Sequence, residues 1–398
     1  MNILVVCQYY WPEPFRLADI CEELVSRGHK VSVVTGVPNY PGGDIYEGYR
    51  HGKNRRQEKG GVKIARTYTI GRKKNHFFRV LNYYSFAISS KCYVKHVEED
   101  FDVVLAYQAS PVMMAQAAVK YAKKHGKKTL LYCMDLWPSS LRAGGIAPES
   151  SVYRAFHRVS EKIYCGVDKI AVSSDGFRGY FRETFGIPEE KLVYLPQYAD
   201  NSFELPKKEK TDSLDLVFAG NIGKAQNIET IILAANELKD KKHIKWNIIG
   251  DGSSLGELKE LAAGFGLDNV FFHGYMKADA LEKAYSAADA MLMTLTPDPV
   301  ISLTLPLKVM SYMGSGRPII AAVDGAAAEE IKKAGCGYVV PAGDYKGLAN
   351  AVLEFEACDD RGAFCDAAKA HYTKWFRRDR FMDEIEAQLL SLCDGGDK

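Results

Sequence analysis

The chain has 398 residues, of which 47% are hydrophobic and 26% are charged, and its formal net charge is +2 at pH 7. This length excludes a single ordinary core and fits two domains of about 200 residues each. The composition is that of a soluble globular protein without low-complexity stretches.

The near-neutral total conceals a difference between the two halves. Residues 1–200 carry 29 Lys/Arg against 20 Asp/Glu, whereas residues 201–398 carry 23 against 30. Any single run of charged residues is explained equally well by an ordinary solvated surface and by a binding partner. A difference this large between the halves favours an anionic partner for the first half.

Strand and helix patterns alternate from the N-terminus. The apolar run 3–7 predicts a buried strand, helix-spaced apolar residues follow it up to Gly28, and 30–35 predicts the next strand. Further strands are expected at 102–107, 129–133 and 169–174, with a helix at 113–125. This order indicates a parallel sheet with right-handed crossovers.

The second half begins the same pattern again. Strands are expected at 214–219, 246–249, 270–272 and 290–294, and a helix at 255–265. A linker is expected near 195–206. The sequence therefore predicts an α/β protein of two doubly wound Rossmann-like domains facing a cleft. Their expected ranges are 1–198 and 199–372, with a C-terminal helix in 373–398 packing back toward the first domain.

The nine cysteines include no Cys-x-x-Cys pair, and Cys7 and Cys133 fall in predicted buried strands. This pattern favours a reducing compartment over a disulfide or zinc framework. The run 3–7 is interpreted as a core strand rather than part of a signal peptide, and no apolar stretch is long enough to span a bilayer. We therefore expect a cytoplasmic protein.

Two glycine turns follow strands of the second half. Gly220–Asn221–Ile222–Gly223 closes one strand and opens a helix, where backbone N–H groups and the helix dipole favour a phosphate. Gly250–Asp251–Gly252 follows the next strand and should lie at the same sheet edge. Tight turns also use glycine for geometry alone, and that alternative stays open for both loops.

The segment 304–320 is more specific. Pro306 and Pro318 bracket a helix-like stretch that holds Lys308, Ser311 and Tyr312. A lysine one turn into a helix after a proline-restrained loop reaches a diphosphate as a point charge, with backbone amides near Thr304 and Leu305 beside it. A solvated surface lysine is the alternative.

Asp135 follows a buried strand of the first half, where open α/β sheets bind ligands. A carboxylate there can orient a hydroxyl group and stabilise positive charge that develops on a bound ligand; a helix or turn cap before Pro138 is the alternative. Glu13 and Arg16, in the first loop, are candidates for acceptor or phosphate contact. The sequence has no His/Cys cluster, and neither a metal nor a cofactor is expected.

Basic and aromatic residues interleave over 63–96, and helical stretches are expected there. Such a mixture suits an anionic membrane surface. It would also suit nucleic acid, which nothing else supports, and a helix pair packing on its own domain is the plain alternative. The residues are Lys63, Arg66, Arg72, Lys73, Lys74, Arg79, Lys91, Lys95, Phe77, Phe78, Tyr83, Tyr84 and Phe86.

Together these segments make nearly the whole chain resemble the bacterial family 4 glycosyltransferases of the GT-B fold. The branch most similar to it contains colanic-acid and O-antigen N-acetyl-fucosaminyl transferases. The motifs that carry the resemblance are QYYWPEPFR (8–16), RGHKVSVVTGVPNYP (27–41), DLWP (135–138), SSDGFRGYFRETFGIPEEKLVYLPQYAD (173–200), FAGNIGKAQN (218–227), GDG (250–252), FFHGYM (271–276), TLPLKVMSYMGSGRPI (304–319) and AGCGYVVPAGD (334–344).

The resemblance implies hexosyl or N-acetyl-hexosaminyl transfer from a nucleoside-diphosphate sugar, with UDP favoured and with retention at the anomeric carbon. The acceptor would be a glycan or polyprenyl-diphosphate-linked glycan in surface polysaccharide synthesis, at the inner face of the membrane. Asp135 would be catalytic, with Glu13, Arg16 and Trp137 on the acceptor side. The donor residues implied are Gly220, Asn221, Gly223, Gln226, Gly250, Asp251, Gly252, Tyr275, Thr304, Leu305, Lys308 and Ser311.

The chain departs from the family pattern in two places. Many members carry Arg and Lys where Asn221 and Gln226 stand, and a Glu pair where Leu303 and Ser311 stand. Lys308 is then the best remaining cation for the diphosphate. A non-hydrolysing sugar-nucleotide epimerase and a catalytically silent scaffold subunit of a glycan-assembly complex are the alternatives.

Overall fold

The computed structural model describes residues 1–73, 75–199, 205, 208 and 211–394. The chain forms two compact units. Unit 1 comprises Met1–Ser173, Phe177–Leu195 and the chain from Met382 onward, and unit 2 comprises Ser174–Gly176 and Pro196–Phe381. The domain ranges expected from the sequence stay predictions.

Unit 1 contains an eight-stranded sheet in the order β3-β4-β2-β1-β5-β6-β7-β8. All its neighbouring strands are parallel except β3, which is antiparallel to β4 at the edge. The strands are β1 (Asn2–Val6), β2 (Lys30–Thr35), β3 (Arg56–Lys59), β4 (Val62–Arg66), β5 (Val103–Gln108), β6 (Lys128–Cys133), β7 (Lys169–Val172) and β8 (Leu192–Tyr194).

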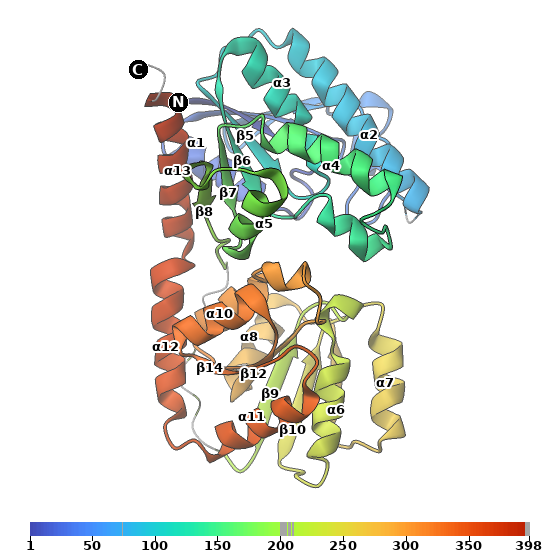
Figure 1. Cartoon of the computed structure of the whole chain (residues 1–398), viewed down its shortest axis with the longest axis vertical. Coiled ribbons are helices and arrows are strands. Elements are labelled where there is room, and N and C mark those ends of the chain that lie inside the picture. The colour runs from blue at the N-terminus through green and yellow to red at the C-terminus, as the bar shows by residue number, and fades with distance from the viewer. Residues whose placement is uncertain (74, 200–204, 206–207, 209–210, 395–398) are drawn as a thin grey trace. The chain divides into compact units, whose positions relative to one another are not determined.

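Right-handed crossovers place α1 on one face of this sheet and α2 and α3 on the other, where α2 and α3 contact each other (Figure 1). Helix α13 lies against α1, and Arg27 forms ion pairs with Asp383 and Glu386 at 2.8 and 2.7 Å. The helices are α1 (Leu17–Ser26), α2 (His76–Tyr93), α3 (Gln116–His125), α4 (Ser151–Tyr164), α5 (Gly176–Phe185) and α13 (Arg378–Asp394). Because both faces are covered, β5 is buried at all six positions.

Unit 2 contains a six-stranded parallel sheet in the order β11-β10-β9-β12-β13-β14. Its strands are β9 (Leu214–Ala219), β10 (Ile244–Ile249), β11 (Val270–Gly274), β12 (Ala290–Thr294), β13 (Ile319–Ala322) and β14 (Gly337–Val340). Its helices are α6 (Glu229–Glu237), α7 (Leu255–Gly264), α8 (Ala278–Ala287), α9 (Leu307–Gly314), α10 (Gly325–Ala334), α11 (Tyr345–Ala357) and α12 (Arg361–Trp375).

The alternation of side chains along β9 divides unit 2 into two cores. Leu216 and Phe218 pack with residues of α6, α7 and α11. Val217 and Ala219 pack with residues of α8, α9, α10 and α12 on the opposite face. The sequence prediction of doubly wound α/β sheets is therefore confirmed, and β2, β9 and β12 have the expected bounds.

The prediction for 63–96 was wrong in part, because its start is a strand rather than a helix. In β4 buried Val62, Ile64 and Arg66 alternate with the exposed Lys63, and the strand pairs with both β2 and β3. Burial of every second residue is the pattern of a strand, and it distinguishes this run from the helix that follows it, α2. Lys74 lies outside the described residues.

Candidate functional site

The two predicted glycine loops interlock at the carboxyl edge of the unit 2 sheet. Gly220 and Gly250 follow β9 and β10, and the Gly220 N–H donates to the Ile249 carbonyl at 2.9 Å. A Cβ added to Gly250 would lie 1.8 Å from the Gly220 carbonyl oxygen, and Gly250 has a φ of +139°. Only glycine therefore permits this approach of the two loops.

Gly252 and its neighbour Asp251 make a second set of contacts between the same two loops. The Ile222 N–H donates to the Asp251 carbonyl at 2.9 Å, and a Cβ on Gly252 would lie 2.3 Å from the Ile222 carbonyl oxygen. The Asp251 carboxylate accepts from the Gly252 N–H at 2.8 Å. The structure thus brings the first and second glycine loops into one assembly.

Gln226 stabilises the first loop from within. Its side-chain oxygen accepts from Asn221 Nδ2 at 3.1 Å and from the Gly223 N–H at 3.3 Å. Its main-chain carbonyl accepts from the Thr294 hydroxyl at 2.6 Å, which ties the loop to the end of β12. Asn221 and Gln226 therefore bind each other at the positions where many family members carry cations.

Lys308 approaches this assembly from α9. Its Nζ lies 3.9 Å from the centre of the Phe218 ring, and a Cβ on Gly220 would lie 2.7 Å from Nζ. The ammonium is buried and makes no hydrogen bond within the described part of the chain, and burial lowers its pKa to about 7. The alternative of a solvated surface lysine is wrong. Lys308 is the second residue of α9, and so lies in the first turn rather than one turn in.

A buried ammonium without a hydrogen-bond acceptor is costly, because only the face of the Phe218 ring replaces part of its lost hydration. An anion beside Gly220 would supply the missing partner and raise the lysine pKa. The same place offers the N–H groups of a glycine turn at the edge of an open α/β sheet. The arrangement can bind a phosphate group.

Tyr312 is a part of this site that sequence reasoning did not assign. Its hydroxyl accepts from the Ala219 N–H at 3.0 Å and donates to the Ala219 carbonyl at 3.1 Å. Strand β9 pairs with β12 only at Leu216 and Val217. At Ala219, where this pairing has ended, the Tyr312 hydroxyl bonds the main chain of β9 instead. Its spacing of four residues from Lys308 on one helix was the available signal.

The other predicted donor residues surround the glycine loops. Tyr275 is 79% exposed and follows Gly274, whose carbonyl accepts from the Gly250 N–H at 2.8 Å. Thr304 and the buried Leu305 lie in the segment that leads into α9, which contains the half-buried Ser311. Direct contact of these residues with a donor stays a prediction.

Asp135 lies two residues beyond the end of β6 in unit 1. One carboxylate oxygen accepts from Trp137 Nε1 at 3.2 Å, and the other accepts from the Ser140 hydroxyl. Burial raises the pKa of Asp135, and the hydrogen bonds from Ser140 and Trp137 oppose that rise. The side chain is thus held in one orientation. Trp137 is 4% exposed, so its ring has little surface open to a ligand, and its role in the structure is to hold the Asp135 carboxylate.

Glu13 is buried and holds two loops together. Its carboxylate accepts the N–H groups of Asn39 and Tyr40, both at 2.8 Å, and of Tyr10 at 3.1 Å. Burial raises its pKa to about 7, against the effect of these three donors. Arg16 is half-buried at the start of α1. Acceptor contact by Glu13 and Arg16 stays a prediction.

Two family descriptions match the chain. Residues 15–197 match "Glycosyl transferase 4-like domain" and residues 213–357 match "Glycosyl transferases group 1". The chain is a family 4 glycosyltransferase. The predicted resemblance is therefore confirmed. Most of the motifs on which it was based lie within one of the two matched regions, whereas QYYWPEPFR (8–16) lies mostly before the first.

Curated relatives cover most of the glycosyltransferase. It is 24% identical over 343 residues, 79% of this chain and 82% of the relative, to the Escherichia coli protein named "Putative colanic acid biosynthesis glycosyl transferase WcaI". It is 26% identical over 267 residues, 64% and 66% of the two chains, to "Probable glycosyltransferase WbjE" of Pseudomonas aeruginosa.

Solved structures share its GT-B fold. Sucrose-phosphate synthase from Thermosynechococcus elongatus is similar with a TM-score of 0.74 at 16% identity, over 99% of this chain and 100% of the other. HepE of Anabaena, solved with UDP, is similar with a TM-score of 0.71 at 15% identity, over 98% and 100%.

Metal ligands and cavities complete the description of the glycosyltransferase. Within the described residues, no group of three or more His, Cys, Asp or Glu side chains is placed to hold a metal, and the nine cysteines are free thiols.

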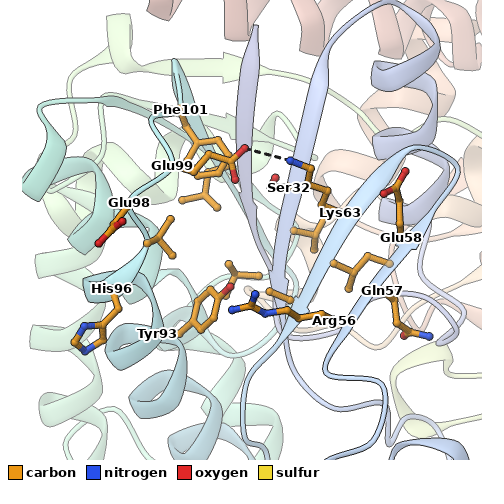
Figure 2. A pocket seen from close by; sticks show the side chains of 16 residues that line it. Ser32, Arg56, Gln57, Glu58, Lys63, Tyr93, His96, Glu98, Glu99 and Phe101 are labelled. Atoms are coloured by element: carbon orange, nitrogen blue, oxygen red, sulfur yellow. Dashed lines mark ion pairs between the residues drawn. The ribbon is translucent and has the colours of Figure 1, made fainter.

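A cavity of about 680 Å³ in unit 1 lies between β2, β3, β4 and the segment after α2, with the Lys63–Glu99 ion pair at 3.7 Å on its wall (Figure 2). None of the predicted site residues lines this cavity.

Proposed function

We propose that this glycosyltransferase moves a sugar from a UDP-sugar to a polyprenyl-diphosphate-linked glycan, with retention at the anomeric carbon. The observation that carries the donor half is the buried Lys308 ammonium, without a hydrogen-bond partner among the described residues, beside Gly220. A diphosphate at Gly220 satisfies that charge and the N–H groups of the glycine loops. The solved HepE complex with UDP supports a uridine nucleotide as the first choice.

In the proposed reaction, the acceptor hydroxyl attacks the anomeric carbon on the face from which the diphosphate leaves. The departing phosphate oxygen takes the hydroxyl proton, so no covalent intermediate on the protein is needed. Lys308 stabilises the negative charge that grows on the diphosphate. Asp135, held by Trp137 and Ser140, orients the acceptor hydroxyl and stabilises the positive charge of the sugar.

An exposed apolar stripe on α2 supports a lipid-linked acceptor at an anionic membrane. Phe77, Val80, Tyr84 and Ile88 follow helical spacing and are 64, 48, 46 and 56% exposed. Lys73 and Arg79 are exposed cations of the same segment. A helix with such a stripe lies in the plane of the membrane interface. No helix in the described ranges is both long and apolar enough to cross a bilayer.

The biological role that we propose is assembly of a surface polysaccharide at the inner face of the cell membrane. This part of the proposal is supported by the similarity to the WcaI and WbjE proteins. An N-acetyl-hexosaminyl or hexosyl donor fits this class of pathway.

A donor screen tests the proposal. Thermal shift with UDP-, GDP- and ADP-sugars should give the largest stabilisation with a UDP-sugar, because a ligand that binds only the folded state raises its stability. The selected donor is then consumed in the presence of a prenyl-diphosphate-linked sugar. Interconversion of the donor sugar without acceptor would favour an epimerase instead, and absence of any nucleotide binding would favour a scaffold subunit.

Vesicle binding tests the membrane part. Wild type should bind anionic vesicles at low salt, and Phe77→Ser/Ile88→Ser should lower the salt-resistant fraction of binding without changing nucleotide affinity. A matched control, Phe265→Ser/Phe271→Ser in unit 2, replaces two other exposed aromatic residues and should bind vesicles as wild type does. Wild-type protein that ignores anionic vesicles at low salt would contradict membrane attachment.

A further inference from the structure

A cavity of about 320 Å³ lies on α4 in unit 1, outside every residue set discussed so far. It is lined by Pro148, Tyr153, Arg154, His157 and Arg158. The two arginines are exposed and lie one helical turn apart, so both guanidinium groups reach the same side of the helix. The cavity therefore combines two permanent positive charges, an imidazole and a phenol.

These cations form no ion pair in the described part of the chain. No hydrogen bond or ion pair of the Arg154, His157 or Arg158 side chains occurs among the residues that the structure describes. On α5, by contrast, Arg178 and Arg182 share the carboxylate of Glu189 at 2.8 and 3.5 Å. Like charges one turn apart destabilise a helix, so a bound anion would relieve this pair.

The cavity adjoins the loop that holds Asp135. The Tyr153 hydroxyl lies 3.4 Å from the Ser139 hydroxyl, and the next turn of α4 brings the Phe156 ring to 5.5 Å from the Trp137 ring. Trp137 in turn donates to the Asp135 carboxylate. A group bound on α4 is thus connected through two packed contacts to the proposed catalytic carboxylate.

We propose that Arg154, His157 and Arg158 bind a phosphoryl group, namely the diphosphate of the lipid-linked acceptor. This inference rests on the proposed function above. Guanidinium groups present paired N–H donors that match phosphate oxygens, which a lysine does not. Tyr153, which lines the cavity, contacts the loop that carries Asp135, so a diphosphate bound here would hold the acceptor against the helix that packs on that loop. A free phosphate compound is the other source of the same chemistry.

The test is calorimetric titration of the full-length protein carrying Lys308→Ala, in which the donor site binds diphosphates more weakly and interferes less with the titration. The probes are farnesyl diphosphate below its micellar concentration, inorganic diphosphate and farnesol. We expect farnesyl diphosphate to bind, inorganic diphosphate to bind at least about tenfold more weakly, and farnesol not to bind. Inorganic diphosphate binding as tightly as the prenyl compound would overturn the lipid assignment.

Two double variants in the same background locate the site. Arg154→Ala/Arg158→Ala should weaken farnesyl diphosphate binding at least about tenfold, because two charge-assisted contacts are lost. The control Lys123→Ala/Lys124→Ala removes the same charge from exposed positions of α3 and should bind as the parent does. Equal affinity of the arginine variant and its parent, or an equal loss in the control, would overturn the site.

The outcomes separate this inference from the proposed function. With Lys308 intact, Arg154→Ala/Arg158→Ala should keep the UDP affinity of wild type and raise KM only for a diphosphate-linked acceptor. If donor binding fails in wild type while farnesyl diphosphate still binds at α4, the proposed donor is wrong and the phosphoryl site stands. If donor binding is normal and α4 binds no diphosphate, only this inference falls.

Discussion

The carboxyl edges of the two sheets differ in how their buried charged groups are hydrogen-bonded. In unit 2, the Lys308 ammonium is buried and has no hydrogen-bond partner within the described residues. In unit 1, Glu13 accepts three backbone N–H groups and Asp135 accepts from Trp137 and Ser140. One edge therefore carries an unsatisfied charge, and the other carries carboxylates that the protein itself already orients.

The difference teaches what each edge is built to receive. An unpaired buried cation destabilises the empty protein and gains most from a ligand that carries negative charge. A carboxylate held by hydrogen bonds gains little from binding but is fixed in direction, which suits a group that acts on a transition state. We therefore expect changes at the unit 2 edge to alter donor affinity and changes at Asp135 to alter turnover.

The largest effect is expected from Gly250→Ala. The new Cβ would lie 1.8 Å from the Gly220 carbonyl oxygen in a backbone region that alanine avoids, so the cost should exceed about 4 kcal/mol. Thermal denaturation should show unfolding or a large fall in Tm together with lost nucleotide binding. Gly256→Ala in α7 is the control, because its Cβ meets open space. An unchanged Tm for Gly250→Ala would mean that the loops do not interlock.

Asp135→Asn should separate turnover from donor affinity. Loss of the negative charge should lower kcat by roughly 100- to 1000-fold, as for other groups that stabilise charge in a transition state. The donor Kd from calorimetry should stay within about twofold, since the asparagine keeps the size of the side chain. Ser140→Ala is a milder companion that frees one carboxylate oxygen. Equal losses in kcat and donor affinity would instead make Asp135 a structural or donor-binding residue.

Lys308→Met should weaken nucleoside-diphosphate binding by about ten- to a hundredfold, or roughly 1.5–3 kcal/mol, because one charge-assisted contact is lost. Calorimetry with UDP measures the change, and Lys332→Ala on the surface of α10 is the control for loss of a charge. Wild-type affinity in Lys308→Met would remove the lysine from the donor site.

A smaller effect is expected on the stability of the ligand-free protein. The folded pKa of Lys308 is lowered to about 7, below the usual lysine value of about 10.4, so the unfolded chain binds more protons between these pH values. The free energy of unfolding should therefore rise from about pH 7 to about pH 10. Lys308→Met should lack this component and have the higher Tm at pH 6. A pH dependence identical in the two proteins would contradict a buried charge.

Much of the fold was predictable because its strands are buried on both faces. Continuous apolar runs such as 30–35 and 214–219 identify such strands directly, and the structure has them at these bounds. The edge hairpin was not predictable in this way. Strand β3 has the sequence RQEK, which contains no apolar side chain, and it exists because β4 offers a free edge.

The residue types of the candidate site were predictable from the sequence, but the contacts and burial of these residues were not. Glycines 220 and 250 and the lysine at 308 are visible as a pattern after strands and a proline. That Tyr312 bridges both main-chain groups of Ala219 depends on α9 meeting the end of β9, which lies 93 residues earlier. No local pattern encodes a contact of that sequence separation.

The sequence by itself determined two α/β sheets, the positions of most of their central buried strands, the glycosyltransferase family and the residue types at each sheet edge, since these follow from local periodicity and short motifs. Only the tertiary structure decided which charges are satisfied. Glu13 and Asp135 find donors within unit 1, whereas Lys308 and the α4 arginines find no acceptor among the described residues. The reason is physical, because burial and hydrogen bonding of a charge depend on what folding brings to within about 3 Å of it.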